Sequence, residues 1–242
     1  MSTGQVPGFT AQLPTGSRAV LVAVSKPATK ASWTPRGIRQ TPWVYPKILT
    51  NWKDILGDNP QNVRVITLRM TRRRKDDYPS AVFSINNGPI VNASFTALED
   101  KAKPWFWWIG MLKDVKSGEK TSDVKVGLSD DEWQVRGQVR AGARASATGI
   151  GFNPQIANVT NAVNPFFEVK VTLPAALLRD AVRVKAYDQK GKAMPSGGST
   201  TKPGAAEQFY SFKGTSKTLG TLQLETRKYH WTTFKQVRLE PR

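Results

Sequence analysis

The stretch WQVRGQVR, residues 133–140, carries the clearest strand pattern in the chain. Its odd positions hold apolar or small residues, and its even positions hold glutamine or arginine. Because successive side chains of a β-strand point to opposite faces of the sheet, this alternation predicts a strand with one apolar and one polar face. The predicted apolar face consists of Trp133, Val135, Gly137 and Val139. The predicted polar face consists of Gln134, Arg136, Gln138 and Arg140.

Short segments of the same kind recur along most of the chain. They lie at 63–70, 81–85, 90–95, 104–112, 167–173, 182–187, 207–213, 219–225 and 231–239. The turn sequence Asn87-Gly88 separates two of them and favours a hairpin between 81–85 and 90–95. A chain of about 8–10 such strands, with turn residues between them, is typical of an antiparallel β-sandwich or barrel.

Two segments have the spacing of a short helix. In 46–58, apolar residues repeat at helical intervals, Pro46 opens the segment and Gly57 ends it. The segment 174–181 is shorter and opens with Pro174. We therefore expect one or two short helices beside a mainly β body.

The first 50 residues contain no acidic residue, and prolines interrupt them at 7, 14, 27, 35, 42 and 46. Because proline removes a backbone donor and breaks regular structure, this composition predicts an extended arm with one short strand at 19–24. The expected division is a basic, proline-rich N-terminal arm over residues 1–45 and a β-rich body over residues 46–242. Trp33 and Trp43 are costly to leave in water, so part of the arm is expected to dock on other structure.

The chain of 242 residues carries 36 lysine and arginine residues against 18 acidic ones, a formal net charge of +18. So large an excess repels itself in a folded protein, and a polyanion would supply the missing counter-charge. Nucleic acid is the expected partner, because lysine and arginine on phosphates release condensed counterions. A basic protein that is merely soluble is the alternative interpretation of the same charge.

Four consecutive basic residues, 72–75, stand between two predicted strands. The strands would fix this cluster in space and present its charges together to a phosphate backbone. The tip of a hairpin that only faces water is the alternative. Further basic residues lie in the arm, on predicted polar faces and near the C-terminus. Together the candidate nucleic-acid-binding residues are Arg36, Arg39, Arg72, Arg73, Arg74, Lys75, Arg136, Arg140, Arg144, Arg227 and Lys228.

Aromatic residues accompany the basic residues near the C-terminus. Tyr229 and Trp231 follow Arg227 and Lys228 directly. Aromatic rings among cations are suited to single-stranded nucleic acid, where they stack on bases. Packing of the same rings in the core is the alternative that we favour for aromatic residues in strands.

The residues offer little support for catalysis. His230 is the single histidine, and cysteine is absent, so a histidine-based triad or a thiolate metal site is not expected. The adjacent acidic residues of a strand point to opposite faces and make poor chelating clusters. We expect no enzyme, no cofactor and no metal, although a calcium ion at a subunit interface near Asp130 or Asp131 stays open.

No apolar run approaches the roughly 18 residues that a membrane span requires. The N-terminal residues lack the charged and apolar regions of a signal peptide. We therefore expect neither a membrane partner nor secretion.

The organisation of the chain resembles that of the coat proteins of small icosahedral RNA viruses. The points of resemblance are the acid-free basic arm, the β-rich body, the absence of cysteine and two long loops rich in glycine, serine and alanine, at 140–165 and 188–206. The resemblance implies a jelly-roll shell domain and a homo-oligomer of many copies that assembles around nucleic acid, RNA rather than DNA. It also implies a place in the virion, and in the host cytoplasm before assembly.

Two other classes of function stay open. One is a nucleic-acid-binding protein that forms no capsid, such as a movement protein, a nucleoprotein or a single-strand-binding protein. The other is an enzyme that acts on a polyanion. Closed particles would separate a coat protein from the first class, and an activity screen would separate it from the second.

Overall fold

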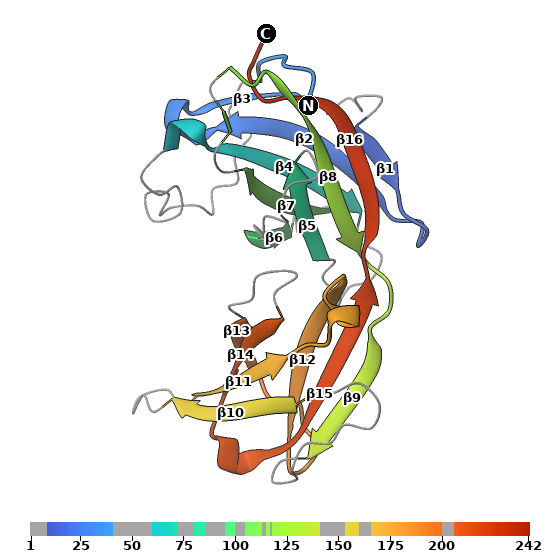
Figure 1. The fold of residues 1–242 in the computed structure, drawn as a ribbon, viewed down its shortest axis with the longest axis vertical. Helices are drawn as coiled ribbons and strands as arrows, with labels where there is room; N and C mark the ends of the chain where they lie inside the picture. Colours follow the sequence, from blue (N-terminus) through green and yellow to red (C-terminus); the bar gives the residue numbers. More distant parts are fainter. Residues whose placement is uncertain are drawn as a thin grey trace. The chain divides into compact units, whose positions relative to one another are not determined.

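The computed structural model describes residues 9–40, 60–71, 80–85, 95–99, 105–112, 115–116, 118–140, 153–159, 166–199 and 206–242. Within these residues the chain forms β1 to β16 and four short 3-10 helices, with no α-helix. All strand pairs are antiparallel, so the expected mainly β, antiparallel class is confirmed. The chain divides into two compact units, a first unit of Met1–Asp130 with His230–Arg242 and a second unit of Asp131–Tyr229 (Figure 1).

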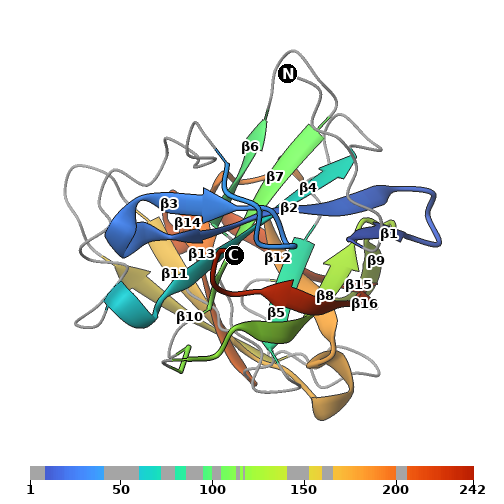
Figure 2. The same cartoon turned by 90° about the horizontal axis from the view of Figure 1, so that it is seen from above.

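The first unit contains a six-stranded sheet and a three-stranded sheet. The larger sheet has the order β1 (Thr10–Gln12), β2 (Arg18–Lys26), β4 (Arg64–Thr71), β7 (Trp105–Leu112) and β6 (Phe95–Glu99), and β3 (Ala31–Trp33) pairs with β2. The smaller sheet has the order β16 (His230–Arg238), β8 (Thr121–Ser129) and β5 (Ser80–Ile85), which Figure 2 shows side by side. Buried side chains of both sheets, among them Leu21, Leu68, Phe83, Val126 and Phe234, form one hydrophobic core.

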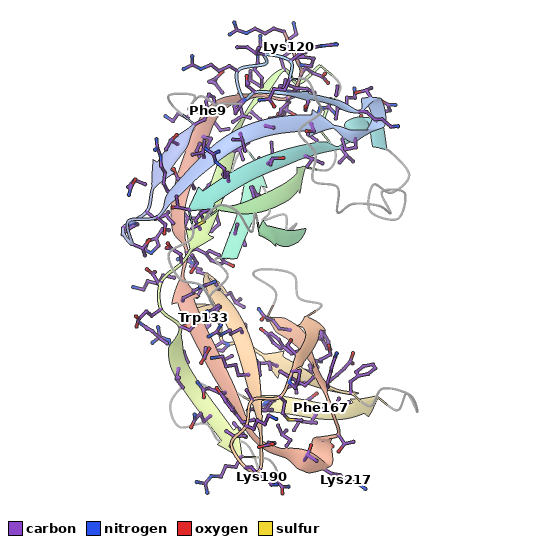
Figure 3. All side chains as sticks on the ribbon, turned by 180° about the vertical axis from the view of Figure 1, so that it is seen from behind. Phe9, Lys120, Trp133, Phe167, Lys190 and Lys217 are labelled. Atoms are coloured by element: carbon purple, nitrogen blue, oxygen red, sulfur yellow. The ribbon has the colours of Figure 1, made fainter. Side chains whose placement is uncertain are left out.

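The second unit has its own core between two further sheets. One sheet has the order β10 (Asn153–Val159), β11 (Phe166–Thr172), β14 (Glu207–Lys213) and β13 (Ser196–Ser199). The other has the order β12 (Asp180–Asp188), β15 (Leu219–Lys228) and β9 (Gln134–Arg140). The rings of Phe167 and Phe212 stack with centroids 5.5 Å apart, and Leu222 and Leu224 belong to the same core (Figure 3).

The structure therefore has two cores where the strand pattern predicted one sandwich. The boundary was invisible in the sequence, because a single residue, Tyr229, separates β15 of the second unit from β16 of the first. Of the predicted hairpin between 81–85 and 90–95, residues 86–94 lie outside the described residues. Strand β5 pairs with β8, and β6 pairs with β7 in the other sheet.

Residues 10–33 differ from the expected extended arm, since they form β1, β2 and β3 of the six-stranded sheet. Phe9, Leu21 and Trp33 are buried in the core of the first unit. The prolines do not interrupt these strands: Pro14 lies in the turn between β1 and β2, and Pro27 begins the 3-10 helix Pro27–Thr29. The described part of the segment 1–45 is thus built into the first unit.

Of the two predicted helices, 46–58 lies outside the described residues. The segment 174–181 forms only the 3-10 helix Ala175–Leu177 before β12 begins at Asp180. Leu177 is buried there, but pairing of β12 with β15 takes over from Asp180 onward, which ends the helical turn. In the described part of the chain, no helix is long and apolar enough to cross a membrane.

Candidate nucleic-acid interface

The basic run 72–75 and Arg144 lie outside the described residues. The strands on either side of the run are described, however. Strand β4 ends at Thr71 and belongs to the six-stranded sheet, whereas β5 begins at Ser80 and belongs to the three-stranded sheet. The strands that flank the run therefore belong to different sheets of the first unit and do not pair with each other.

Basic residues from three distant segments meet at one end of the first unit. The segments are the turn after β3, the residue before β8 and the residues that end and follow β16. We call this surface the basic end. Figure 3 labels Lys120 there, among other side chains with nitrogen-bearing tips. The basic end consists of Arg36, Arg39, Lys120, Arg238 and Arg242.

Backbone hydrogen bonds join the three segments. The amide of Arg238 donates to the carbonyl of Pro35, and the amide of Arg242 donates to the carbonyl of Gly37, each at 2.9 Å. The amide of Leu239 donates to the carbonyl of Lys120, also at 2.9 Å. The fold thus places these five cations together, although more than 200 residues of sequence separate the first from the last.

Gly37 allows the close approach at this junction. Its φ of +88° lies in the left-handed region, where a residue with a side chain is strained. A Cβ at this position would also lie 3.1 Å from Cγ of Arg242 and 3.3 Å from Cγ of Arg238. The sequence RGIR at 36–39 therefore combines two cations with the glycine that lets two more pack beside them.

The carboxylate of Glu240 does not neutralise the basic end. It pairs with Arg64, which is buried, and its oxygen lies 3.8 Å from Nζ of Lys26. Arg36, Arg39, Lys120 and Arg242 are exposed, and Arg238 is half-buried. Exposed side chains of this kind can reorient toward a ligand with several negative charges.

The second unit carries another group of charges, on the outer face of its three-stranded sheet. The strand register places Arg183 opposite Glu225 and Lys185 opposite Gln223. We call this surface the charged face. It consists of Gln138, Arg140, Arg183, Lys185, Gln223, Glu225 and Arg227.

A β-bulge in β9 changes the faces that the alternation predicted. Val135 pairs with Glu225 and Gly137 pairs with Leu224, so Arg136 is an extra residue between them. Consequently Val135 lies on the charged face, 53% exposed, instead of in the core. Arg136 donates from Nε to Oγ1 of Thr226 at 2.9 Å. Thr226 and Glu225 are neighbours in β15, so their side chains lie on opposite faces of the sheet. Arg136 therefore lies on the face opposite to that of Gln138 and Arg140.

Trp133 packs on the charged face and engages two of its cations (Figure 3). The guanidinium carbons of Arg183 and Arg227 each lie 4.1 Å from the centroid of its ring. Arg227 is only 2% exposed. A phosphate therefore has no access to Arg227 in this arrangement, although the sequence predicted it as a binding residue.

Glu225 pairs with two cations of the charged face, Arg183 and Lys185. One carboxylate oxygen lies 2.5 Å from Nε of Arg183, and the other lies 3.2 Å from Nζ of Lys185. Gln223 also donates to this carboxylate, at 2.7 Å. Because Arg183, Lys185 and Arg227 are already paired or stacked and only Arg140 of its cations is exposed, the charged face offers a polyanion less than the basic end does.

Replacing Glu225 with glutamine is expected to lower the free energy of unfolding by about 1–3 kcal/mol. The carboxylate is buried, and its loss leaves Arg183 and Lys185 without a counter-charge; their partial exposure moderates the cost. Glu207→Gln is the matched control, because Glu207 also pairs with a lysine but is 55% exposed, so its loss should cost at most about 1 kcal/mol. Urea denaturation of both variants measures the difference, and equal costs would contradict the structural role of Glu225.

The remaining predicted residues are placed as follows. Lys228 is exposed at the end of β15, beside half-buried Tyr229. Burial raises the pKa of the Tyr229 hydroxyl to about 12. Burial also raises the pKa of Asp180, against the opposing effect of Arg136 and Lys228.

No group of three or more metal-ligating side chains occurs among the described residues. Both carboxylate oxygens of Asp130 accept from the hydroxyl of Thr15, at 2.7 and 2.8 Å. Asp130 thus serves the first unit as a link to the turn between β1 and β2. His230 begins β16 and pairs with Leu128 in the strand ladder.

Lys120 is one of three residues of the basic end that the sequence did not predict as binding residues. It stands alone in the sequence among residues of mixed charge, and only the pairing of β8 with β16 brings it to the C-terminal segment. Arg238 and Arg242 are the other two: they belong to the basic residues near the C-terminus, but nothing local in the sequence joins them to Arg36 and Arg39.

Comparison of the chain with protein-family models, curated proteins and solved structures found no match. The fold defines the class of the protein as mainly β, built from several antiparallel sheets.

Proposed function

We propose that this protein binds nucleic acid through the basic end, without reading its sequence. The observation that carries the proposal is the convergence of Arg36, Arg39, Lys120, Arg238 and Arg242 from three segments. Four of these side chains are exposed, and Glu240 is occupied by Arg64 and Lys26. Contacts of such cations with phosphates position a protein on nucleic acid but carry no base information.

The net charge of +18 supports the same proposal. The counterions released from phosphates by several lysines and arginines favour binding at low salt. The basic run 72–75 adds four charges to the same unit and lies in the sequence between β4 and β5, which belong to its two sheets. The first unit therefore contributes the main binding surface in this proposal, and the charged face of the second unit is mainly structural.

The finer form of the proposal is a coat protein that assembles in many copies around RNA. The β-rich fold, the basic charge and the resemblance in organisation support it, and the resemblance also implies a jelly-roll arrangement. A nucleic-acid-binding protein that forms no shell is the alternative. Electron microscopy of the purified protein with and without RNA separates the two, since only a coat protein forms closed particles.

Binding to a fluorescent RNA of random sequence is expected to weaken steeply as salt rises. If all five cations of the basic end contact phosphates of a single strand, they contribute about 3.5 units to the slope of log affinity against log salt. Fluorescence anisotropy between low and moderate salt measures this slope. Absence of binding at low salt, or binding that salt does not weaken, would refute the proposed function.

A further inference from the structure

Trp231 lies flat on the outer face of the three-stranded sheet of the first unit. It pairs with Gly127 across β16 and β8. A Cβ at Gly127 would lie 3.1 Å from two carbon atoms of the indole and 2.8 Å from Cγ2 of Val82. The glycine thus leaves room for the ring to rest directly on the neighbouring strand, and the side chain is still 39% exposed.

One cation contacts this ring, and another lies further along its strand. Nζ of Lys125 lies 5.0 Å from the ring centroid, and Lys235 is exposed four residues further along β16. An exposed cation–π contact is worth only about 0.5–1 kcal/mol, so Lys125 can leave the ring for a phosphate at little cost. Asp123 also lies on this face, and the backbone amide of Gln236 donates to its carboxylate at 2.9 Å.

Strand β16 connects the ring to the basic end. It runs from His230 to Arg238, and Arg238 is a member of the basic end. A bulge between Phe234 and Val237 shortens the strand, so Trp231 and Arg238 pair with Gly127 and Thr121 of β8 and lie roughly 20 Å apart at about 3.3 Å per residue. An aromatic platform at one end of a row of cations is the arrangement by which proteins hold a single strand of several nucleotides.

We propose that Trp231 stacks on an unpaired base, and that the ligand of the first unit is single-stranded nucleic acid whose backbone follows β16 to the basic end. This inference rests on the proposed function and narrows it. The contacts between phosphates and cations supply affinity for any nucleic acid, single-stranded or double-stranded. The exposed indole adds a contact that only an unstacked base can make, because the bases of a duplex present their edges and not their faces.

The test compares two ligands of equal length, a single-stranded RNA and its duplex, binding to the full chain at one salt concentration. Trp231→Leu is expected to weaken single-strand binding by between about 5- and 150-fold, the range that stacking of one base supplies. Duplex binding and the salt slope should stay unchanged, since no charge is removed. Trp231→Phe should retain most of the single-strand affinity.

The matched control is Phe209→Leu in the second unit. Phe209 is also an exposed aromatic residue with a lysine near its ring, Nζ of Lys170 at 5.9 Å from its centroid. Its loss should leave both affinities at the wild-type value. An equal loss in both variants, or an equal loss for single strand and duplex in Trp231→Leu, would overturn the stacking proposal.

A second measurement covers the case in which Trp231→Leu fails to fold. The wild-type protein is titrated with a single strand of abasic sugar phosphates of the same length. Its affinity should fall by the same 5- to 150-fold relative to the strand that carries bases. Equal affinity for the two strands would overturn the role of Trp231 while leaving the proposed function intact, whereas no binding of either strand would refute the proposed function itself.

Discussion

Replacing Trp33 with alanine is expected to lower the free energy of unfolding of the first unit by about 3–5 kcal/mol. The side chain is fully buried in the core, so its removal leaves a large cavity. Its Nε1 also donates to the carbonyl of Arg238 at 2.8 Å, and the substitution leaves that carbonyl without this donor. A loss of this size is a large share of the 5–15 kcal/mol that typically stabilises a domain.

The control for this prediction is Ile38→Ala, five residues along the same segment. Ile38 is 61% exposed, so its loss should change stability by no more than about 0.5 kcal/mol. Urea denaturation, monitored by the backbone signal in far-ultraviolet circular dichroism, measures the free energy of unfolding of both variants. This signal does not rely on the fluorescence of the replaced tryptophan. If Trp33→Ala is as stable as Ile38→Ala, residues 10–33 are not part of the core and the extended-arm interpretation is restored.

The same packing predicts the effect of deleting residues 1–45. It removes β1, β2 and β3, including the strand β2 that pairs with β4 at the centre of the larger sheet. The first unit should then fail to fold cooperatively, whereas an independent arm could be removed without loss.

The second large effect is expected on binding. A variant with glutamine at all five positions of the basic end carries a net charge of +13, because five positive charges are removed from +18. At about 0.1 M salt its affinity for single-stranded RNA should fall by up to about 3,000-fold, the value reached if each cation contributes about 0.7 logarithmic units. Four of the side chains are exposed, so the variant should stay folded.

A charge-matched control separates this local effect from the loss of overall charge. Five exposed cations of the second unit serve the purpose, and their replacement with glutamine also gives +13. They are Arg179, Lys190, Lys192, Lys213 and Lys217. The control variant should lose far less affinity, because long-range attraction is screened beyond about 10 Å at 0.1 M salt.

Much of the fold could be predicted from alternation alone, because alternation is set by burial and leaves a direct trace in the sequence. The segments 167–173 and 182–187 coincide closely with β11 and β12. Pairing partners left no such trace. Strand β5 follows β4 in the chain but pairs with β8, since partners are chosen by packing of whole sheets and not by proximity in sequence.

In the candidate site, too, the local sequence predicted some features and the packing of the sheets decided others. Arg36 and Arg39 were predicted from charge, and the structure places them in the basic end. Arg227 was predicted with equal reason, but it is buried against Trp133, because one bulge at Arg136 turned the tryptophan onto the charged face. Local charge thus identified cations, and only the fold separated those that face water from those that stabilise a sheet.

The dependence of RNA affinity on salt, measured side by side for the wild type and the two charge-matched variants, decides whether the basic end contacts phosphates. The slope of log affinity against log salt should be shallower than wild type by up to about 3.5 units in the basic-end variant, and nearly unchanged in the control variant. Equal slopes in the two variants would contradict the proposal, because they would mean that the nucleic acid responds to the total charge of the protein and has no contact with the basic end.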